Sequence, residues 1–269
     1  MNILVCVKQV PDTTAVKIDP VTNTLIRDGV PSILNPFDGF ALEMALRMKE
    51  QAGGTVTLVS MGPPQAENAL RDGLAVGADD AFLVSGREFG GSDTLATSYI
   101  LSCAVKAIED RKGEKFDVIF CGKQAIDGDT GQVGPEMAEH LDYTQITYAT
   151  ELVSCENGKV QIRKETAEGY DVLEAALPLV VSVTKTPYEL RFPTVKKRLA
   201  ANRAQIVTIT PQDMEGQIDL TRAGLKGSPT KVKKSFTPVH NKVCTVVEED
   251  SPSASAVKLV ALLSDAKKI

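Results

Sequence analysis

The 269-residue sequence has no tryptophan, only two histidines and only five cysteines. The cysteines are odd in number and form no CxxC pair, which argues against a disulfide framework and against a zinc site. We therefore expect reduced, mostly buried thiols and no metal site. His140 and His240 lie far apart in the sequence, so each is interpreted as a helix-face or loop residue.

Long apolar runs and an excess of basic residues are also missing. No apolar stretch approaches the ~18 residues that a membrane-spanning helix needs. The formal net charge is -5, so we expect no membrane insertion and no sequence-independent binding to nucleic acid. The segment NILVCV at the N-terminus indicates a strand instead of a signal sequence, and the cytoplasm is the expected location.

Strand and helix patterns alternate over the first two-thirds of the chain. Asp38 is the expected N-cap of the first helix. Two short runs, Val16–Ile18 and Leu25–Ile26, are expected to pair across a turn at Pro20–Asn23. The other expected strands are Asn2–Val7, Val56–Ser60, Ala81–Val84 and Phe116–Cys121, and the expected helices are Gly39–Gln51, Pro63–Val76 and Ser92–Arg111. This order predicts an α/β fold, with a mostly parallel sheet and helices on both faces.

From Tyr148 onward the pattern changes. Glu151–Cys155 and Lys159–Arg163 flank the sequence Glu-Asn-Gly, which favours a tight hairpin. Two further strand-like runs follow, at residues 170–175 and 179–184. The sequence therefore predicts an antiparallel hairpin extension on the parallel sheet.

The last third of the chain is less regular. Residues beyond Thr186 form an irregular stretch, and beyond Asp219 the chain is rich in Gly, Pro and Lys until a helix at Ala254–Leu263. We expect two parts: an α/β domain at residues 1–218 and a long C-terminal arm at residues 219–269. Such an arm usually belongs to a linker or to a segment that embraces another subunit, and we favour the embrace, the alternative being a disordered tail.

The most informative stretch is CGKQAIDGDTGQVGPE, residues 121–136, which runs from an apolar strand into a helix start at Pro135. Gly128, Gly131 and Gly134 recur every third residue. A backbone without Cβ atoms can approach a bulky ligand and direct its N–H groups at phosphate oxygens. The stretch therefore predicts a nucleotide site, the alternative being a glycine-rich turn that binds nothing.

Two acidic residues in this stretch constrain how a nucleotide would lie. Asp127 and Asp129 would repel phosphate if they pointed inward. We therefore expect them to face ribose hydroxyls, backbone amides or the helix N-terminus.

A second glycine-rich sequence, Gly90-Gly91-Ser92-Asp93, resembles the loop of ATP pyrophosphatases and offers a rival function as a nucleotide-activating ligase. That loop belongs after the first strand, whereas here it follows a later one. Ser92 or Asp93 is therefore better explained as a helix N-cap.

Several motifs together resemble the β subunit of electron-transfer flavoproteins, and they are spread over most of the chain. GKQAID followed by a glycine-rich turn is highly specific, and an upstream NPF strengthens the match. The motifs are CVKQVPD (residues 6–12), NPFD (35–38), SMGP (60–63), GADDAFLV (77–84), CGKQAIDGDTGQVGP (121–135) and the stretch at residues 163–178.

The resemblance implies a flavodoxin-like or Rossmann-like subunit that binds an adenine nucleotide and pairs with an α subunit carrying its own FAD. By position, Cys6 and Met61 would lie beside the base, and Asn35, Pro36, Phe37 and Asp38 around base and ribose. Ribose and phosphate would be surrounded by Gly122, Lys123, Gln124, Ala125, Ile126, Asp127, Gly128, Asp129, Thr130, Gly131, Gln132, Val133 and Gly134. These positions converge at one crevice, where open α/β sheets bind ligands.

The family has two branches. In one the β subunit holds AMP and the heterodimer is a single-electron shuttle between acyl-CoA dehydrogenases and a membrane quinone reductase. In the other the β subunit holds FAD, accepts hydride from NADH and bifurcates electrons to ferredoxin or flavodoxin and to an acyl-CoA dehydrogenase. The sequence GDTGQVGP resembles the FAD branch. The cofactor would carry the redox chemistry, so no side chain is expected as a catalytic base. Lys164 is a candidate to reach the subunit interface or a flavin, or else is an exposed hairpin charge.

The segment at residues 191–200 resembles the family's recognition loop, which docks on the dehydrogenase. Arg191, Phe192 and Val195 are the expected partner contacts, with Val195 as the apolar anchor where relatives often have leucine. A smaller anchor buries less area, which would weaken the contact by about 1 kcal/mol. A non-catalytic AMP module that only stabilises its partner subunit is the remaining alternative.

Overall fold

The computed structural model describes residues 1–12, 17–18, 25–26, 31–231, 233 and 244–269. By internal contacts the chain forms two units, Met1–Lys233 and Lys234–Ile269. Among the described residues, no helix combines the length and apolar character needed to cross a bilayer.

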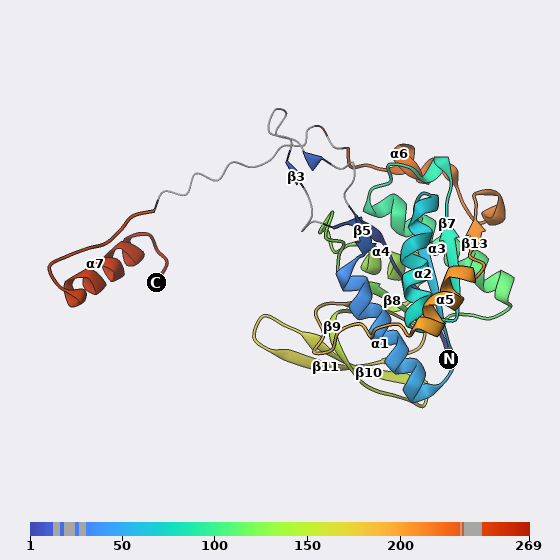
Figure 1. Ribbon diagram of the computed structural model, residues 1–269, viewed down its shortest axis with the longest axis horizontal. Coiled ribbons are helices and arrows are strands. Elements are labelled where there is room, and N and C mark those ends of the chain that lie inside the picture. Colours follow the sequence, from blue (N-terminus) through green and yellow to red (C-terminus); the bar gives the residue numbers. More distant parts are fainter. Residues whose placement is uncertain (13–16, 19–24, 27–30, 232, 234–243) are drawn as a thin grey trace. The chain divides into compact units, whose positions relative to one another are not determined.

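The first unit is built on a nine-stranded sheet in the order β11-β10-β9-β12-β8-β1-β6-β7-β13 (Figure 1). All neighbours from β9 through β12 to β13 are parallel, whereas β10 is antiparallel to both of its neighbours, β9 and β11. The strands are β1 (Asn2–Cys6), β6 (Thr55–Met61), β7 (Asp80–Val84), β8 (Val118–Gly122), β9 (Thr144–Glu156), β10 (Lys159–Glu165), β11 (Tyr170–Ala176), β12 (Leu179–Val183) and β13 (Val207–Ile209). This confirms the predicted α/β fold and its hairpin extension.

Helices cover both faces of the sheet (Figure 1). Helices α1 and α2 pack in one core cluster, and α3 and α4 in the other. Strand β1 supplies both, because successive side chains of a strand point to opposite faces: Ile3 and Val5 belong to the first cluster, Leu4 and Cys6 to the second. The helices are α1 (Pro36–Ala52), α2 (Glu67–Val76), α3 (Thr94–Lys112), α4 (Val133–Leu141), α5 (Val195–Arg203), α6 (Gly224–Gly227) and α7 (Pro252–Asp265).

The hairpin turn has the conformation that its sequence predicts. Asn157 and Gly158 both have positive φ, 53° and 72°. A two-residue type I′ turn requires this at both central positions. Two short antiparallel pairs lie outside the large sheet: β2 (Gln9–Pro11) with β5 (Ser32–Leu34), and β3 (Lys17–Ile18) with β4 (Leu25–Ile26). The second pair confirms the expected pairing, although Val16 and the turn at residues 20–23 lie outside the described residues.

Two local expectations were wrong. Asp38 is not the N-cap of α1, because the helix already begins at Pro36 and Asp38 lies in its first turn. Proline is well suited to the first helical position, since the N–H it lacks would have no partner there. The stretch after Thr186 is not irregular throughout, because α5 forms with Thr194 as its N-cap. Its sequence has helix-forming residues but no apolar periodicity, and so gave no helix signal.

The start of the expected C-terminal arm packs on the first unit. The Ser228 hydroxyl accepts the Asp93 N–H at 2.9 Å, and an Asp93 carboxylate oxygen accepts the Thr230 N–H at 2.9 Å. The first unit accordingly runs to Lys233, beyond the boundary that the sequence suggested at residue 218. The expected helix near the C-terminus is present as α7. That the arm embraces a partner subunit stays a prediction.

Two helical glycines give a matched test of packing between α2 and β6. A Cβ at Gly73 would lie 2.4 Å from Leu58 Cδ1, whereas a Cβ at Gly39 would meet its nearest atom at 3.7 Å. Alanine gains about 0.5–1 kcal/mol over glycine within a helix, while overpacking costs about 1–3 kcal/mol. We expect Gly73→Ala to lower, and Gly39→Ala to raise, the free energy of unfolding measured in urea. Shifts of the same sign would contradict this account.

Candidate functional site

The candidate site lies where the strand order of the parallel sheet reverses. Strand β1 sits between β6 and β8, so the chain moves to one side of β1 first and to the other side later. Loops leaving the carboxyl ends of strands separate at such a point and leave a crevice. A cavity of about 930 Å³ lies there, lined from the ends of β1, β6, β7 and β8. This is near the upper end of the ~300–1,000 Å³ typical of small-molecule sites.

Asp38 joins three chain segments beneath this cavity. Its buried carboxylate accepts the Lys8 N–H at 2.7 Å, the Asn35 side-chain amide at 2.9 Å and the Gly122 N–H at 3.2 Å. Burial raises the pKa of Asp38 to about 7, against the opposing effect of these three donors. A Cβ at Gly122 would lie 2.3 Å from Asp38 Oδ1 and 2.8 Å from the Asp38 backbone nitrogen. Only glycine allows this close approach of β8 to α1.

In the glycine-rich stretch after β8, some backbone N–H groups donate hydrogen bonds to the protein and others remain available at the cavity. The N–H groups of Lys123, Ile126, Gly128 and Thr130 donate to protein acceptors, as does that of Gly122. In the part of the chain that the structure describes, the N–H groups of residues 131–134 have no acceptor. They surround the first turn of α4, where the helix dipole also favours an anion. The amides that remain available to an anion are therefore concentrated at residues 131–134.

The two acidic residues of this stretch do not line the cavity. Asp127 pairs with Lys8, whose Nζ lies 2.7 Å from Asp127 Oδ1, and Asp129 is exposed. Neither carboxylate therefore lines the cavity, in line with the electrostatic expectation, but the partner found for Asp127 is the Lys8 ammonium and not one of the expected groups.

Two cysteines form part of the cavity wall. Cys6 and Cys121 are buried free thiols at the ends of β1 and β8. Hydrogen bonding to Cys121, together with burial, raises the pKa of Cys6 well above its ordinary value. A neutral thiol is a poor nucleophile, so Cys6 supplies a polarisable, apolar surface to the cavity. In the described residues no cluster of His, Cys, Asp or Glu is arranged to hold a metal ion.

Most of the residues named from the sequence line the cavity. They are Cys6, Asn35, Asp38, Met61, Gly122, Lys123, Gln124, Ala125, Gly128, Thr130, Gly131, Gln132, Val133 and Gly134. Pro36, Phe37, Ile126, Asp127 and Asp129 lie outside its lining. Asn35 still acts on the cradle, because its side chain donates to the Gln124 carbonyl and accepts the Ile126 N–H.

Sequence reasoning missed part of the cavity wall, here called the outer lobe. It is formed after β7 and at the start of α3, with Thr208 from β13. The glycine-rich sequence at residues 90–93 gave the signal, but it was explained only as a helix cap; Asp93 does cap α3, accepting the Ala96 N–H at 3.1 Å. The outer-lobe residues are Ser85, Gly86, Arg87, Phe89, Gly90, Gly91, Ser92, Asp93, Thr94, Thr97 and Leu101.

Lys164 contacts residues of β9 and does not line the cavity. Its Nζ donates to Thr147 Oγ1 at 3.1 Å and lies 5.9 Å from the centroid of the Tyr148 ring. Lys123, a cradle residue, lies over the same ring at 4.8 Å. Tyr148 has a positive φ of 58°, at an irregularity in the pairing of β9. The fold thus brings both lysines to one ring, although a role for Lys164 at a flavin stays a prediction.

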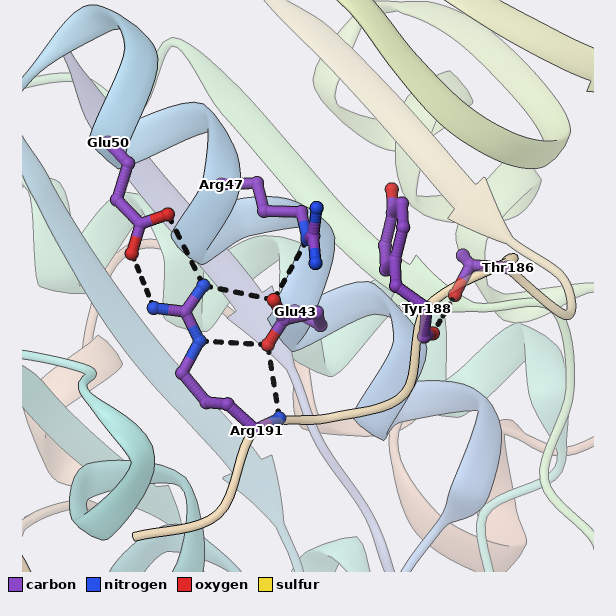
Figure 2. Close-up of polar contacts among 6 residues, drawn as sticks. All are labelled: Glu43, Arg47, Glu50, Thr186, Tyr188 and Arg191. Carbon is purple, nitrogen blue, oxygen red and sulfur yellow. Dashed lines mark hydrogen bonds and ion pairs between the residues drawn. The ribbon is translucent and has the colours of Figure 1, made fainter. Parts of the chain in front are cut away.

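The expected partner contacts are separate from the cavity. Phe192 and Val195 are 92% and 79% exposed. Arg191 instead turns back onto α1, where its guanidinium binds Glu43 and Glu50 (Figure 2).

Comparison with known proteins shows to which family the chain belongs. The electron transfer flavoprotein domain matches residues 22–214. The chain belongs to the electron transfer flavoprotein family. It is 52% identical over 258 residues to an electron transfer flavoprotein subunit beta of Megasphaera elsdenii, with 94% of each chain covered. It is 48% identical over 256 residues to the subunit of the same name from Clostridium acetobutylicum, covering 95% of each. Protein FixA of Azorhizobium caulinodans is 43% identical over 263 residues, covering 97% of this chain and 93% of FixA.

Family membership confirms the resemblance that the motifs carry. The electron transfer flavoprotein chain matches its β-subunit relatives across nearly its full length. An electron-transfer role follows for the whole chain.

The buried carboxyl of Asp38 predicts a distinctive pH dependence. Its pKa rises from 3.8 to about 7 on folding, so the folded state binds a proton more tightly between these values. Its contribution to stability is therefore full below pH ~4 and is lost as the pH rises through ~7, by at most a few kcal/mol. Asp38→Asn cannot titrate. We expect the stability difference between wild type and Asp38→Asn, from urea midpoints at pH 4–8, to become less favourable to wild type as the pH rises. A pH-independent difference would refute the assignment.

Proposed function

We propose that this chain is the β subunit of a heterodimeric electron transfer flavoprotein that holds FAD in the cavity and bifurcates electrons. The bound flavin would accept hydride from NADH. One electron would pass to ferredoxin or flavodoxin and the other, through the FAD of the α subunit, to an acyl-CoA dehydrogenase. This chemistry belongs to the cytoplasm, where NADH and these carriers are present. The alternative is a β subunit that holds AMP structurally in a single-electron shuttle.

The volume of the cavity and the extent of its lining support this proposal. An adenine mononucleotide needs the cradle at residues 131–134 and the wall formed by Cys6 and Met61. The cavity continues past them to the outer lobe after β7, for a total of about 930 Å³. A dinucleotide uses both lobes, with its pyrophosphate at the unpaired amides and its second half toward Arg87 and Thr97. This extension favours FAD over AMP.

The protein's own groups would bind and orient the cofactor. The N-terminus of α4 and the amides of residues 131–134 would hold the pyrophosphate. Cys6 and Met61 present apolar surface to a planar ring system. Lys123 and Arg87 line the cavity and supply positive charge, which stabilises an anionic, reduced ligand. The redox chemistry is that of the flavin, and these residues supply position and electrostatics.

Two surfaces would serve the partner proteins. The α subunit would be embraced by the C-terminal part of the chain. Helix α7 offers an unpaired apolar set for this purpose, made of Val257, Leu259, Val260, Leu262 and Leu263. The acyl-CoA dehydrogenase would dock on exposed Phe192, which lies between β12 and α5, and on exposed Val195, the first residue of α5.

Cofactor content tests the proposal directly. We expect the heterodimer, co-purified with its α subunit, to release more than one flavin per complex and no AMP. NADH should bleach the visible flavin band, and ferredoxin should be reduced only when the dehydrogenase and its acceptor are also present. A single flavin accompanied by AMP would establish the alternative.

A variant of the outer lobe separates the two cofactors. Thr97 lines this lobe, whereas Leu95, on the same turn of α3, does not. Thr97→Tyr should fill the space needed by the flavin half and leave the cradle intact, so that the heterodimer loses its second flavin but still takes up adenine mononucleotide. Leu95→Tyr should retain both flavins. Equal flavin content in the two variants would place the flavin elsewhere.

A further inference from the structure

The segment that follows β12 presents apolar side chains to solvent. Residues 186–203, here called the docking segment, comprise an irregular stretch followed by α5. Phe192, Val195 and Leu199 are 92%, 79% and 52% exposed. Residues 185–194 form neither helix nor strand, so no regular backbone ladder holds them. The shape of this stretch depends on the side chains that fix it.

One arginine ties the irregular stretch to α1 (Figure 2). Arg191 Nε lies 2.9 Å from Glu43 Oε2, Arg191 Nη2 lies 2.9 Å from Glu43 Oε1, and the Arg191 N–H donates to Glu43 Oε2 at 3.2 Å. Arg191 Nη1 also pairs with Glu50, about two turns further along the helix. The guanidinium is thus held at two carboxylates, and its own backbone is held as well.

Glu43 is the buried centre of this arrangement. Its side chain is only 2% exposed. Although burial opposes its charge, hydrogen bonds from Arg191 and Arg47 hold the pKa of Glu43 below its usual value. Arg47 then lies over the Tyr188 ring, 4.0 Å from its centroid. The contacts therefore hold the irregular stretch of the docking segment at two points, Tyr188 and Arg191.

A second arginine fixes the other end. Arg71 of α2 donates to the carbonyls of Ala201 and Ala204 at 2.9 and 3.1 Å. These lie in the last turn of α5 and just beyond it, where carbonyls lack helical partners. The exposed apolar residues therefore stand between two anchors on the helical layer of the protein.

We propose that Arg191 is a positioning residue for docking: its pairs with Glu43 and Glu50 hold Phe192, Val195 and Leu199 in the arrangement that enters an apolar hollow on the acyl-CoA dehydrogenase. Fixing the segment before contact removes an ordering cost that binding would otherwise carry. Arg191, expected from the sequence to touch the partner, instead acts through its neighbours. The inference rests on the docking role proposed above, which the FAD and AMP alternatives share.

Steady-state kinetics with the complete heterodimer test this inference. A short-chain acyl-CoA dehydrogenase reduced by its acyl-CoA serves as the enzyme, and the flavoprotein is its varied substrate. We expect Arg191→Gln to raise KM about ten-fold, as for loss of a well-organised contact, with kcat and flavin content unchanged. Hydrogen exchange of the amides at residues 186–194 should become faster in the same variant.

Arg198→Gln is the matched control. It also removes an arginine–carboxylate pair from the docking segment, but the Arg198–Asp72 pair is largely exposed on both sides. Exposed pairs contribute little, so KM and amide exchange should stay near wild type. Phe192→Ala should raise KM without changing exchange, and combining it with Arg191→Gln should give less than the product of the two effects.

The outcomes separate the two proposals. If Phe192→Ala raises KM but Arg191→Gln changes neither KM nor exchange, the positioning role is wrong and docking stands. If Arg191→Gln raises KM with normal exchange, Arg191 touches the dehydrogenase directly, which also overturns positioning. If Phe192→Ala, Val195→Ala and Arg191→Gln all leave KM unchanged, docking at this segment fails. Should Arg191→Gln not fold, Arg191→Lys keeps the charge but cannot bind both oxygens of buried Glu43 with a planar fork, and it must still raise both KM and exchange by a smaller factor.

Discussion

The site depends on one buried carboxyl group. Asp38 receives hydrogen bonds from the ends of β1 and β8 and from Asn35 at the start of α1. These three segments diverge at the point where the strand order of the sheet reverses. Without a common acceptor, their amides would be buried without hydrogen-bond partners. The same close approach requires glycine at position 122, because any side chain there would overlap Asp38. The carboxyl thus determines how closely the walls of the cavity approach one another, and its raised pKa reflects the burial that this closeness requires.

The same helix carries a second buried acid with a different purpose. Glu43 lies further along α1 and binds Arg191, a residue that is far away in the sequence. Asp38 organises the cavity, whereas Glu43 organises an exposed surface. Because both belong to α1, the helix that covers one face of the sheet links the cofactor site to the proposed docking segment. Neither acid is exposed, so each acts through the groups it holds.

Much of the site was predictable, since it follows from local rules. Glycines at residues 128, 131 and 134, a preceding apolar strand and a following Pro135 indicated a phosphate cradle, and the family resemblance placed Cys6 and Met61 beside it. The outer lobe was not found, because Gly90 to Asp93 is separated from the cradle in sequence and only the pairing of β6 with β7 brings it to the same edge. Helix α5 was missed for another reason: its apolar residues face solvent, so the usual periodicity is absent.

What the sequence by itself determined is the alternation of strands and helices, the tight turn at Asn157-Gly158, the cradle motif and the family, because each depends on neighbouring residues or on short motifs. The tertiary structure alone decided which amides remain unpaired, how far the cavity extends beyond the cradle, and that Arg191 binds Glu43 instead of solvent or a partner. These properties depend on atoms far apart in the chain. Hydrogen-bond partners and burial are settled only when the whole sheet and its helices are packed together.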